Sequence, residues 1–199
     1  MAVYSELLQE YAVLDEAERV NAVNVIHDEA QRMASLINNL LNISKLDSGT
    51  LQLVRKRVKI HDFLYDAYDT MLPNAQSQHI NLQIKVPPDL GSARLDKDLL
   101  RIAIDNLLSN AIKYSNPGGK VTLSAELLDD NQIEIKIRDE GIGISREDCA
   151  HVFEKYYRAS TSETAKRSGH GLGLYLARQI VDLHQGSIVV ASEIGKGSE

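Results

Sequence analysis

The chain has 199 residues, a formal charge of −6, and hydrophobic and charged fractions of 43% and 25%, which are ordinary for a soluble globular protein. At roughly 100–200 residues per domain, this length allows one substantial domain and a smaller attached element. No apolar run approaches the roughly 20 residues that cross a bilayer, and the N-terminus lacks a secretory signal. The negative charge argues against a nucleic-acid-binding face. The single cysteine, Cys149, excludes an internal disulfide.

A long helix is predicted for residues 15–47. Asp15 and, three residues later, Glu18 form a capping-box pattern at its start. Apolar or small residues then recur at alternating spacings of three and four, which is the seam of a helix that packs lengthwise against others. These seam residues are Val23, Ile26, Ala30, Met33, Ile37, Leu40 and Ser44. A shorter helix at 3–11 precedes it, so residues 1–48 are expected to form a partial antiparallel helical hairpin, followed by a linker at 49–60.

From residue 61 onward, helices and strands alternate, which predicts a second domain over residues 61–199. Helices are expected at 61–78, 96–115, 145–153 and 172–184. Strands are expected at 82–86, 121–127, 133–138 and 187–192, with a hairpin turn at 129–131. The predicted fold class is therefore α+β, a two-layer α/β sandwich with its helices segregated over a mainly antiparallel sheet.

The helix predicted at 96–115 carries a polar stripe of possible ligands. Asn106, Asn110 and Lys113 are spaced four and three apart, so they share one helix face. An amide oxygen can ligate Mg²⁺, and a lysine can neutralise phosphate charge. Exposed polar residues are also the default on an amphipathic helix, so the stripe alone leaves both readings open.

A second candidate motif follows the strand predicted at 133–138. The run 139–144 reads Asp-Glu-Gly-Ile-Gly-Ile. The Asp139 carboxylate can accept a hydrogen bond from an exocyclic amine, and Gly141 and Gly143 allow a flat ring to lie close to the backbone. An ordinary strand-ending turn has the same composition, so this motif is also ambiguous by itself.

A glycine-rich loop at 169–174, Gly-His-Gly-Leu-Gly-Leu, runs into the helix predicted at 172–184. Free amides and the positive end of the helix dipole suit phosphate oxygens. The spacing is neither the Walker pattern nor the Rossmann pattern, since no strand immediately precedes the loop. Upstream lie the run 153–158, Phe-Glu-Lys-Tyr-Tyr-Arg, and a polar stretch at 159–168, which suits either a mobile lid over a nucleotide or an ordinary loop.

Together, in this order and at these spacings, the segments resemble the N, G1, F and G2 boxes of sensor histidine kinases. The first box is carried by residues 107–115, Leu-Leu-Ser-Asn-Ala-Ile-Lys-Tyr-Ser. The resemblance extends back through 36–41, Leu-Ile-Asn-Asn-Leu-Leu, and 44–49, Ser-Lys-Leu-Asp-Ser-Gly, which look like the end of the second helix of the family's dimerisation and phosphotransfer domain. It implies the GHKL, or Bergerat, ATPase fold and a bacterial two-component system.

The resemblance also implies ATP and Mg²⁺ as ligands. Asn110 would ligate Mg²⁺, Lys113 would reach phosphate, and Asp139 would read the adenine amine. The catalytic residues it implies are Asn106, Lys113 and Arg158. The ATP-binding residues it implies are Asn106, Asn110, Lys113, Tyr114, Asp139, Gly141, Gly143, Ile144, Tyr157, Arg158, Gly169, His170, Gly171, Leu172, Gly173 and Leu174. His170 stands where the family usually has a small hydroxyl residue, so only its backbone amide is expected to contact phosphate.

The family's phosphoacceptor motif, Ser-His-Glu-x-x-Thr-Pro on the first hairpin helix, has no counterpart in the sequence. His27 followed by Asp28 has suitable local chemistry, but it lies on the second helix and lacks the following proline. We therefore expect ATP binding without self-phosphorylation, in a portion of an ATP:protein-histidine phosphotransferase. The chain also ends where the family's final strand is expected, so the sheet is expected to lack an edge.

The implied partners are a response regulator receiver domain and, through the hairpin, a second copy of the parent; no nucleic acid is expected. The resemblance places the catalytic region in the cytoplasm and leaves open whether the parent is anchored in the bacterial inner membrane. Two alternatives remain. One is a nucleotide-binding scaffold or dimerisation module without kinase activity. The other is a different GHKL-superfamily ATPase, such as an Hsp90-like chaperone or a type II topoisomerase.

Overall fold

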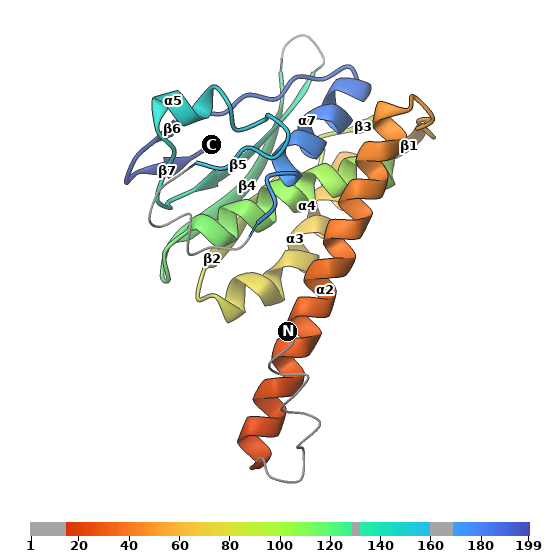
Figure 1. The fold of residues 1–199 in the computed structure, drawn as a ribbon. Coiled ribbons are helices and arrows are strands. Elements are labelled where there is room, and N and C mark those ends of the chain that lie inside the picture. The colour runs from red at the N-terminus through yellow and green to blue at the C-terminus, as the bar shows by residue number, and fades with distance from the viewer. Residues whose placement is uncertain (1–14, 129–131, 160–168) are drawn as a thin grey trace. The chain divides into compact units, whose positions relative to one another are not determined.

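The structure, a computed structural model, describes residues 15–128, 132–159 and 169–199, without the side chains of Asp28 and Arg32 (Figure 1). The chain divides into two compact units, Met1–Thr50 and Leu51–Glu199. Three predicted features lie outside the described residues: the helix at 3–11, the turn at 129–131 and the polar stretch at 159–168 except for its first residue.

Helix α2 (Glu16–Asp47) is the described element of the first unit. Its start has the predicted capping box, in which the Glu18 amide donates to Asp15 Oδ1 at 2.8 Å and the Asp15 amide donates to Glu18 Oε2 at 3.0 Å. Its C-terminal end is also fixed by neighbouring residues, since the Ser48 amide donates to the Ser44 carbonyl at 3.1 Å and Gly49 has φ 65°. Both predicted ends of this helix are confirmed.

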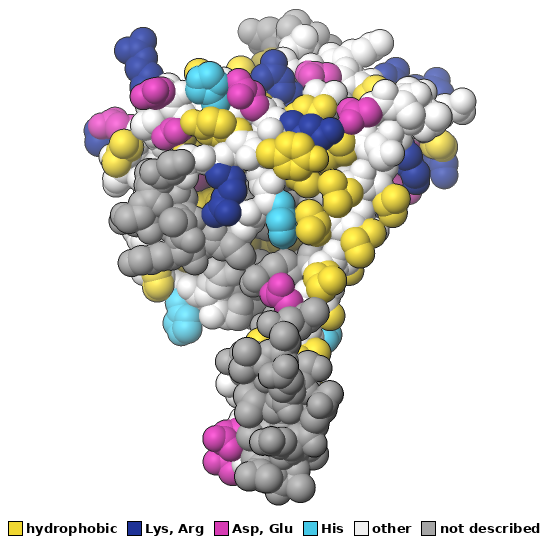
Figure 2. Space-filling model, in the orientation of Figure 1, with side chains coloured by type: hydrophobic (Ala, Val, Ile, Leu, Met, Phe, Trp, Pro, Cys, Tyr) yellow, Lys and Arg dark blue, Asp and Glu magenta, His cyan; other side chains and the backbone are white. Residues whose placement is uncertain are grey.

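Apolar side chains of α2 remain exposed, although a water-soluble helix normally buries them. Val23, Met33, Ile37 and Leu40, all predicted seam residues, are 51%, 46%, 53% and 42% exposed. Figure 2 shows a run of apolar side chains along this helix. A contiguous exposed apolar strip of this kind is typical of a surface that packs against another protein segment.

The second unit is built on a three-stranded sheet in the order β2-β4-β5. Its strands are β2 (Asn81–Lys85), β4 (Lys120–Leu127) and β5 (Ile133–Asp139). β4 and β5 are antiparallel, as a hairpin requires, whereas β2 and β4 are parallel. A parallel pair needs a long crossover, and here β3 (Ser92–Leu95) and α4 (Lys97–Tyr114) lie between the two strands in the sequence.

Two short antiparallel pairs flank this sheet in the described part of the unit. β1 (Lys56–Lys59), which lies within the predicted linker, pairs with β3. Near the C-terminus, β6 (Ser192–Glu193) pairs with β7 (Gly197–Ser198), and the pairing continues as Ala191 exchanges both backbone hydrogen bonds with Glu199. The strand predicted at 187–192 was therefore wrong except for its last residue, because the residues before Ala191 have no partner strand within the described chain.

The helix predicted at 145–153 was too long. α5 (Arg146–Cys149) has only four residues. After it, the Ala150, His151 and Glu154 amides each bond to the carbonyl three residues back, not four. Such tight turns follow a helix end but do not continue the helix.

Helices α3 (Ile60–Ser77) and α4 cover one face of the sheet, and α7 (Gly173–Leu183) packs against α4 (Figure 1). The apolar face of β4 is buried at Val121, Leu123 and Ala125 and meets buried residues of both helices. The largest fully buried side chains include Phe63, Leu64, Leu108 and Ile112. The predicted two-layer sandwich is thus confirmed, and within it α4 contacts both the sheet and α7. None of the helices in the described ranges is long and apolar enough to cross a membrane.

Candidate nucleotide-binding site

Helix α4 is fixed at both ends by its own sequence. The Leu99 amide donates to Asp96 Oδ1 at 3.1 Å at its start, and the Ser115 hydroxyl donates to the Ala111 carbonyl at 2.7 Å at its end. Ile104, Leu108 and Ile112 are buried against the core. The helical repeat therefore leaves the stripe of Asn106, Asn110 and Lys113 outside the core, where all three side chains are half-buried.

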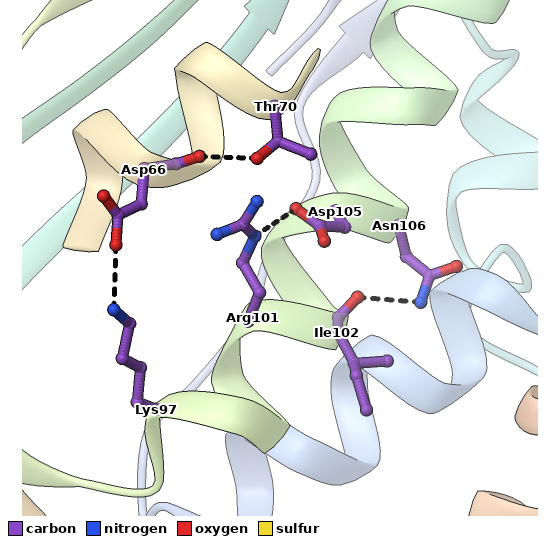
Figure 3. Close-up of polar contacts among 7 residues, drawn as sticks. All are labelled: Asp66, Thr70, Lys97, Arg101, Ile102, Asp105 and Asn106. Carbon is purple, nitrogen blue, oxygen red and sulfur yellow. Dashed lines mark hydrogen bonds and ion pairs between the residues drawn. The ribbon is translucent and has the colours of Figure 1, made fainter.

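Asn106 faces the first turn of α7. Its amide nitrogen donates to the Ile102 carbonyl at 2.8 Å, which fixes the side chain (Figure 3). Its Oδ1 lies 2.7 Å from the position that a Cβ atom on Gly173 would occupy. A side chain at position 173 would displace the Asn106 amide from this place, so the amide of Asn106 and the start of α7 lie close together.

Lys113 contacts the other end of the glycine loop. Its Nζ lies 2.8 Å from the position of a Cβ atom on Gly169 and 4.6 Å from the centroid of the Tyr114 ring. Asn110 lies between Asn106 and Lys113 on the same face, and its side chain makes no hydrogen bond to any described residue. The structure thus brings the polar stripe of α4 and the glycine loop together along one line.

The segment before the loop docks onto it through the backbone. The Tyr156 amide donates to the Gly171 carbonyl at 2.9 Å. Gly171 has φ 67°, and a Cβ atom there would lie 2.6 Å from the Tyr156 carbonyl carbon and 2.7 Å from the Tyr157 oxygen. The next helix, α7, starts at Gly173 without a side-chain cap, so its first amides point into the loop region with the positive end of the helix dipole.

Tyr157 is bound to α5. Its hydroxyl donates to Asp148 Oδ1 at 2.6 Å, and this hydrogen bond raises the pKa of Tyr157 to about 12. Hydrogen bonds from Ser145 and Tyr157 hold the pKa of Asp148 below its ordinary value. Arg158 and His170 are exposed. Among the described residues, no hydrogen bond or ion pair joins His170 to the stripe of α4.

Asp139 ends β5 and is only 7% exposed. Burial raises the pKa of its carboxyl, while hydrogen bonds from the backbone amides of Gly141 and Ser198 partly oppose this shift. The Gly141 amide donates to Asp139 Oδ1 at 2.9 Å, and the Ile142 amide donates to the Tyr114 carbonyl at 3.2 Å. The run 139–144 is therefore joined to the end of α4 by its backbone.

The C-terminal hairpin β6–β7 supports this run, which the sequence reasoning missed. The Gly195 amide donates to the Ile142 carbonyl at 2.8 Å, and the Ile144 amide donates to Ser192 Oγ at 2.7 Å. Gly143 has φ 70°, and a Cβ atom there would overlap the Glu193 backbone. The spacing of Gly195 and Gly197 signals a tight hairpin, but no local pattern indicates what the hairpin packs against.

Clusters of three or more His, Cys, Asp or Glu side chains that could hold a metal ion are absent from the described ranges. On the α4 stripe, the candidate cation ligand remains the amide oxygen of Asn110.

The family model for the histidine kinase-, DNA gyrase B-, and HSP90-like ATPases matches residues 95–199, slightly more than half of the chain. The chain belongs to this ATPase family. The matched range contains α4, the run 139–144 and the glycine loop, and thus every residue of the predicted site. A second model, for the His Kinase A (phospho-acceptor) domain, matches residues 1–49.

Curated relatives carry both parts. Sensor histidine kinase WalK of Bacillus subtilis (strain 168) is 35% identical over 199 residues, covering 100% of this chain and 32% of WalK. The alginate biosynthesis sensor protein KinB of Pseudomonas aeruginosa is 31% identical over 183 residues, covering 92% of this chain and 30% of KinB. The chain thus spans about a third of the length of these relatives. The two family matches and these relatives support the predicted resemblance to bacterial two-component sensor histidine kinases.

Solved structures have the same fold. Full-length ShkA in complex with AMPPNP matches with a TM-score of 0.77 at 24% identity, covering 93% of this chain and 38% of ShkA. Histidine kinase ThkA in complex with the response regulator protein TrrA matches with a TM-score of 0.71 at 17% identity, covering 98% of this chain and 54% of that chain. The predicted family and the predicted GHKL fold are both confirmed.

Proposed function

We propose that this chain binds Mg-ATP and is the catalytic portion of a protein-histidine kinase that transfers the γ-phosphoryl group of ATP to a histidine. One observation carries the proposal. The polar stripe of α4 contacts the glycine loop at both of its ends, through Asn106 at Gly173 and Lys113 at Gly169. The sequence motifs are ambiguous one by one, and this convergence favours a single ligand between them.

The phosphates are proposed to bind where these two segments meet. The uncapped amides at the start of α7 and the Lys113 ammonium are the positive groups there, and glycines at 169, 171 and 173 permit close approach of the ligand. The adenine fits at Asp139, whose buried carboxylate accepts hydrogen bonds and is a natural partner for the exocyclic amine. In this arrangement the adenine base and the phosphates of ATP are bound by separate elements, β5 and α7.

Mg²⁺ fits the donor set of the stripe. The Asn110 amide is half-buried and not hydrogen-bonded to any described residue, so its oxygen is available for a hard cation. Mg²⁺ prefers oxygen ligands and usually keeps several waters and substrate phosphates, which explains why no carboxylate cage is required. When bound, the ion neutralises charge that develops on the phosphates. Asn106, already fixed by Ile102, supports this side of the site.

In the proposed reaction a neutral imidazole nitrogen attacks the γ-phosphorus. The bond from phosphorus to the β,γ-bridging oxygen breaks, ADP leaves, and the imidazole proton passes to a base. Lys113 and Arg158 are proposed to stabilise the charge of the transferred group. None of the six histidines stands in the family's acceptor motif. His27 on α2 accepts a hydrogen bond from the Gln31 amide at 2.8 Å. We therefore propose that the acceptor is not in this chain.

The proposed partners follow from the other unit and from one relative. The exposed apolar strip of α2 fits a helical bundle with a second copy of the parent. ThkA was solved with a response regulator, which favours a receiver domain as the protein that takes the phosphoryl group onward.

Calorimetric titration with AMPPNP, with and without Mg²⁺, tests nucleotide binding. We expect Mg²⁺ to strengthen binding to the wild-type chain. Asn110→Ala should weaken Mg-AMPPNP binding about tenfold, which corresponds to a loss of roughly 1.4 kcal/mol. The matched control is Asp105→Asn, also on α4, because Asp105 bonds Arg101 at 2.7 Å on a neighbouring face (Figure 3). Absence of nucleotide binding by the wild-type chain refutes the proposal.

Incubation with ATP labelled at the γ-phosphate tests the transfer. We expect no label on this chain alone and label on a separately supplied phosphoacceptor hairpin domain. Label on the isolated chain would place an acceptor within it, and hydrolysis without transfer to any hairpin would favour a different ATPase of the same superfamily.

A further inference from the structure

The connector at 51–55 is hydrogen-bonded to the start of α4 through one buried carboxylate. The Val54 amide donates to Asp96 Oδ2 at 2.8 Å, while the Leu99 amide donates to Asp96 Oδ1 at 3.1 Å. Asp96 is only 7% exposed. A single side chain therefore caps α4 with one oxygen and holds the connector with the other. Hydrogen bonds to a charged acceptor are the stronger kind, so neither contact is incidental.

His184 joins the same carboxylate residue to the far end of α7. The Asp96 amide donates to His184 Nε2 at 3.1 Å, and His184 Nδ1 lies 2.8 Å from the Ile180 carbonyl. Both hydrogen bonds form together only when the ring is neutral with its proton on Nδ1. His184 follows the last residue of α7, so this ring fixes the C-terminal end of α7 to the residue that caps α4.

Arg55 adds a second contact between the connector and α7. Its Nη2 donates to the Leu183 carbonyl at 3.1 Å. The last carbonyls of a helix lack partners within it and carry the negative end of the dipole, so a guanidinium is favourable there. Two adjacent connector residues thus hold two helices, one at its beginning and the other at its end.

These helices are the two that meet at the proposed phosphate site. α7 starts at Gly173 against Asn106 and ends at the contacts with Arg55 and His184. With 11 residues, it is about 16 Å long and behaves as one rigid rod. A shift of its C-terminal end relative to α4 therefore moves the glycine loop relative to the stripe.

We propose that Val54, Arg55, Asp96 and His184 form a clasp through which the connector sets the position of α7 along α4, and thereby the affinity of the site for nucleotide phosphates. This inference rests on the proposed function. The four residues are positioning residues, since none of them contacts the stripe or the loop. Because coupling between two sites is reciprocal, bound phosphates also strengthen the clasp.

The predicted base-binding run 139–144 is held by α4 and the β6–β7 hairpin, and none of the clasp residues contacts it. The clasp should therefore affect phosphate binding but not base binding. A residue that acted only on global stability would weaken both equally, so a comparison of AMPPNP with adenosine separates the two roles.

The test uses Val54→Pro, which removes the donor amide, with Val54→Ala as the matched control that keeps it. The Val54 side chain is 61% exposed, so its truncation should have little effect on the fold. Asp96→Asn is the second variant, because Asn is an equally good helix cap but presents an amide donor in place of one acceptor oxygen. Circular dichroism confirms that each variant folds.

For Val54→Pro and Asp96→Asn we expect AMPPNP to bind about fivefold more weakly than to Val54→Ala, at the low end of typical coupling, while adenosine binds equally. Backbone amides of α7 should also exchange hydrogen faster in Val54→Pro than in Val54→Ala, with no nucleotide present. Equal AMPPNP affinities overturn the clasp, as does a parallel loss of adenosine affinity. If the wild-type chain binds no nucleotide, the proposed function fails, and equal exchange of α7 amides in the two variants then overturns the clasp separately.

Discussion

Asp139 is a buried acid without a protein cation beside it. Its carboxylate accepts backbone hydrogen bonds, yet burial dominates and raises its pKa above the ordinary value of 3.8. No Lys or Arg in the described ranges pairs with it. Ionisable groups that are buried without a partner of opposite charge in the free protein are typical of sites that bind a ligand. Substitution of Asp139 should therefore affect the stability of the protein and its affinity for nucleotide in different directions.

Asp139→Asn tests this expectation through pH. Because the folded-state pKa is raised, the wild-type protein is favoured while the acid is neutral and loses stability as pH rises through the folded-state pKa. The Asn side chain does not ionise, so the Asp139→Asn variant does not lose stability in this way. The difference in free energy of unfolding should therefore shift toward the Asn variant as the pH rises above the ordinary carboxyl value of 3.8, as measured by urea unfolding.

Asp89→Asn is the control, since Asp89 is exposed on the same unit. A pH-independent difference at position 139, or an equal shift at position 89, would contradict the effect of burial. At neutral pH we also expect Asp139→Asn to weaken AMPPNP binding about tenfold, because a neutral acceptor replaces a charged one.

Gly171 illustrates a glycine that is required for two reasons. It has φ 67°, and a Cβ atom would overlap the backbone of Tyr156 and Tyr157. Gly118 has φ 83° but nothing within 4 Å of an added Cβ. Alanine at either position should cost about 1–2 kcal/mol from the left-handed backbone alone.

Gly171→Ala should therefore lower Tm more than Gly118→Ala, and only Gly171→Ala should weaken AMPPNP binding, because it separates the loop from the segment that docks on it. Thermal unfolding and titration of both variants measure this. Equal Tm values for the two variants would show that the loop relaxes around the new Cβ.

At the scale of elements, ends fixed by neighbouring residues were predictable from the sequence. The capping box at Asp15 and the helix expected at 96–115 were both found, since α2 and α4 begin at Glu16 and Lys97. The length of α5 and the position of β6 were wrong, because tight turns and the pairing of Ala191 with Glu199 decided them. β3 was missed because four residues are too few to show an alternating pattern.

The same difference holds for the proposed site: features set by neighbouring residues could be predicted, and features set by packing could not. Its motifs could be found because each is a short run with a chemical meaning. The contact of Asn106 with Gly173 could not, since it depends on how α4 and α7 pack. The contacts of Asp96 with Val54 and His184 also could not be predicted, because they join residues far apart in the sequence.

The capping box of α2 gives the prediction at this scale. Asp15→Ala removes the side chain that accepts the Glu18 amide at 2.8 Å, and should destabilise the helix start by about 1 kcal/mol. Amide hydrogen exchange over residues 16–22 measures the effect. Asp15→Asn is the control, because it keeps the acceptor oxygen, and fast exchange in this control as well would assign the effect to charge at the helix dipole.

For the molecule as a whole, the core and the proposed site belong to one of the two units. The core cluster runs from Ile60 to Ala125, and every predicted site residue lies between 106 and 174. The unit Met1–Thr50 contributes none of these residues. A domain with its own core can in principle fold alone.

We therefore expect the chain of residues 51–199 to fold without the first unit and to bind AMPPNP with a Kd within about twofold of that of residues 1–199, since independent domains contribute additively. It keeps Val54 and Arg55, so the clasp should also remain. A chain starting at residue 57 is the informative comparison, because it retains the core but lacks both connector residues, and it should bind AMPPNP about fivefold more weakly with unchanged adenosine affinity. Equal AMPPNP affinities of the two chains would show that the connector does not affect nucleotide binding. Failure of residues 51–199 to fold would show that the first unit stabilises the second.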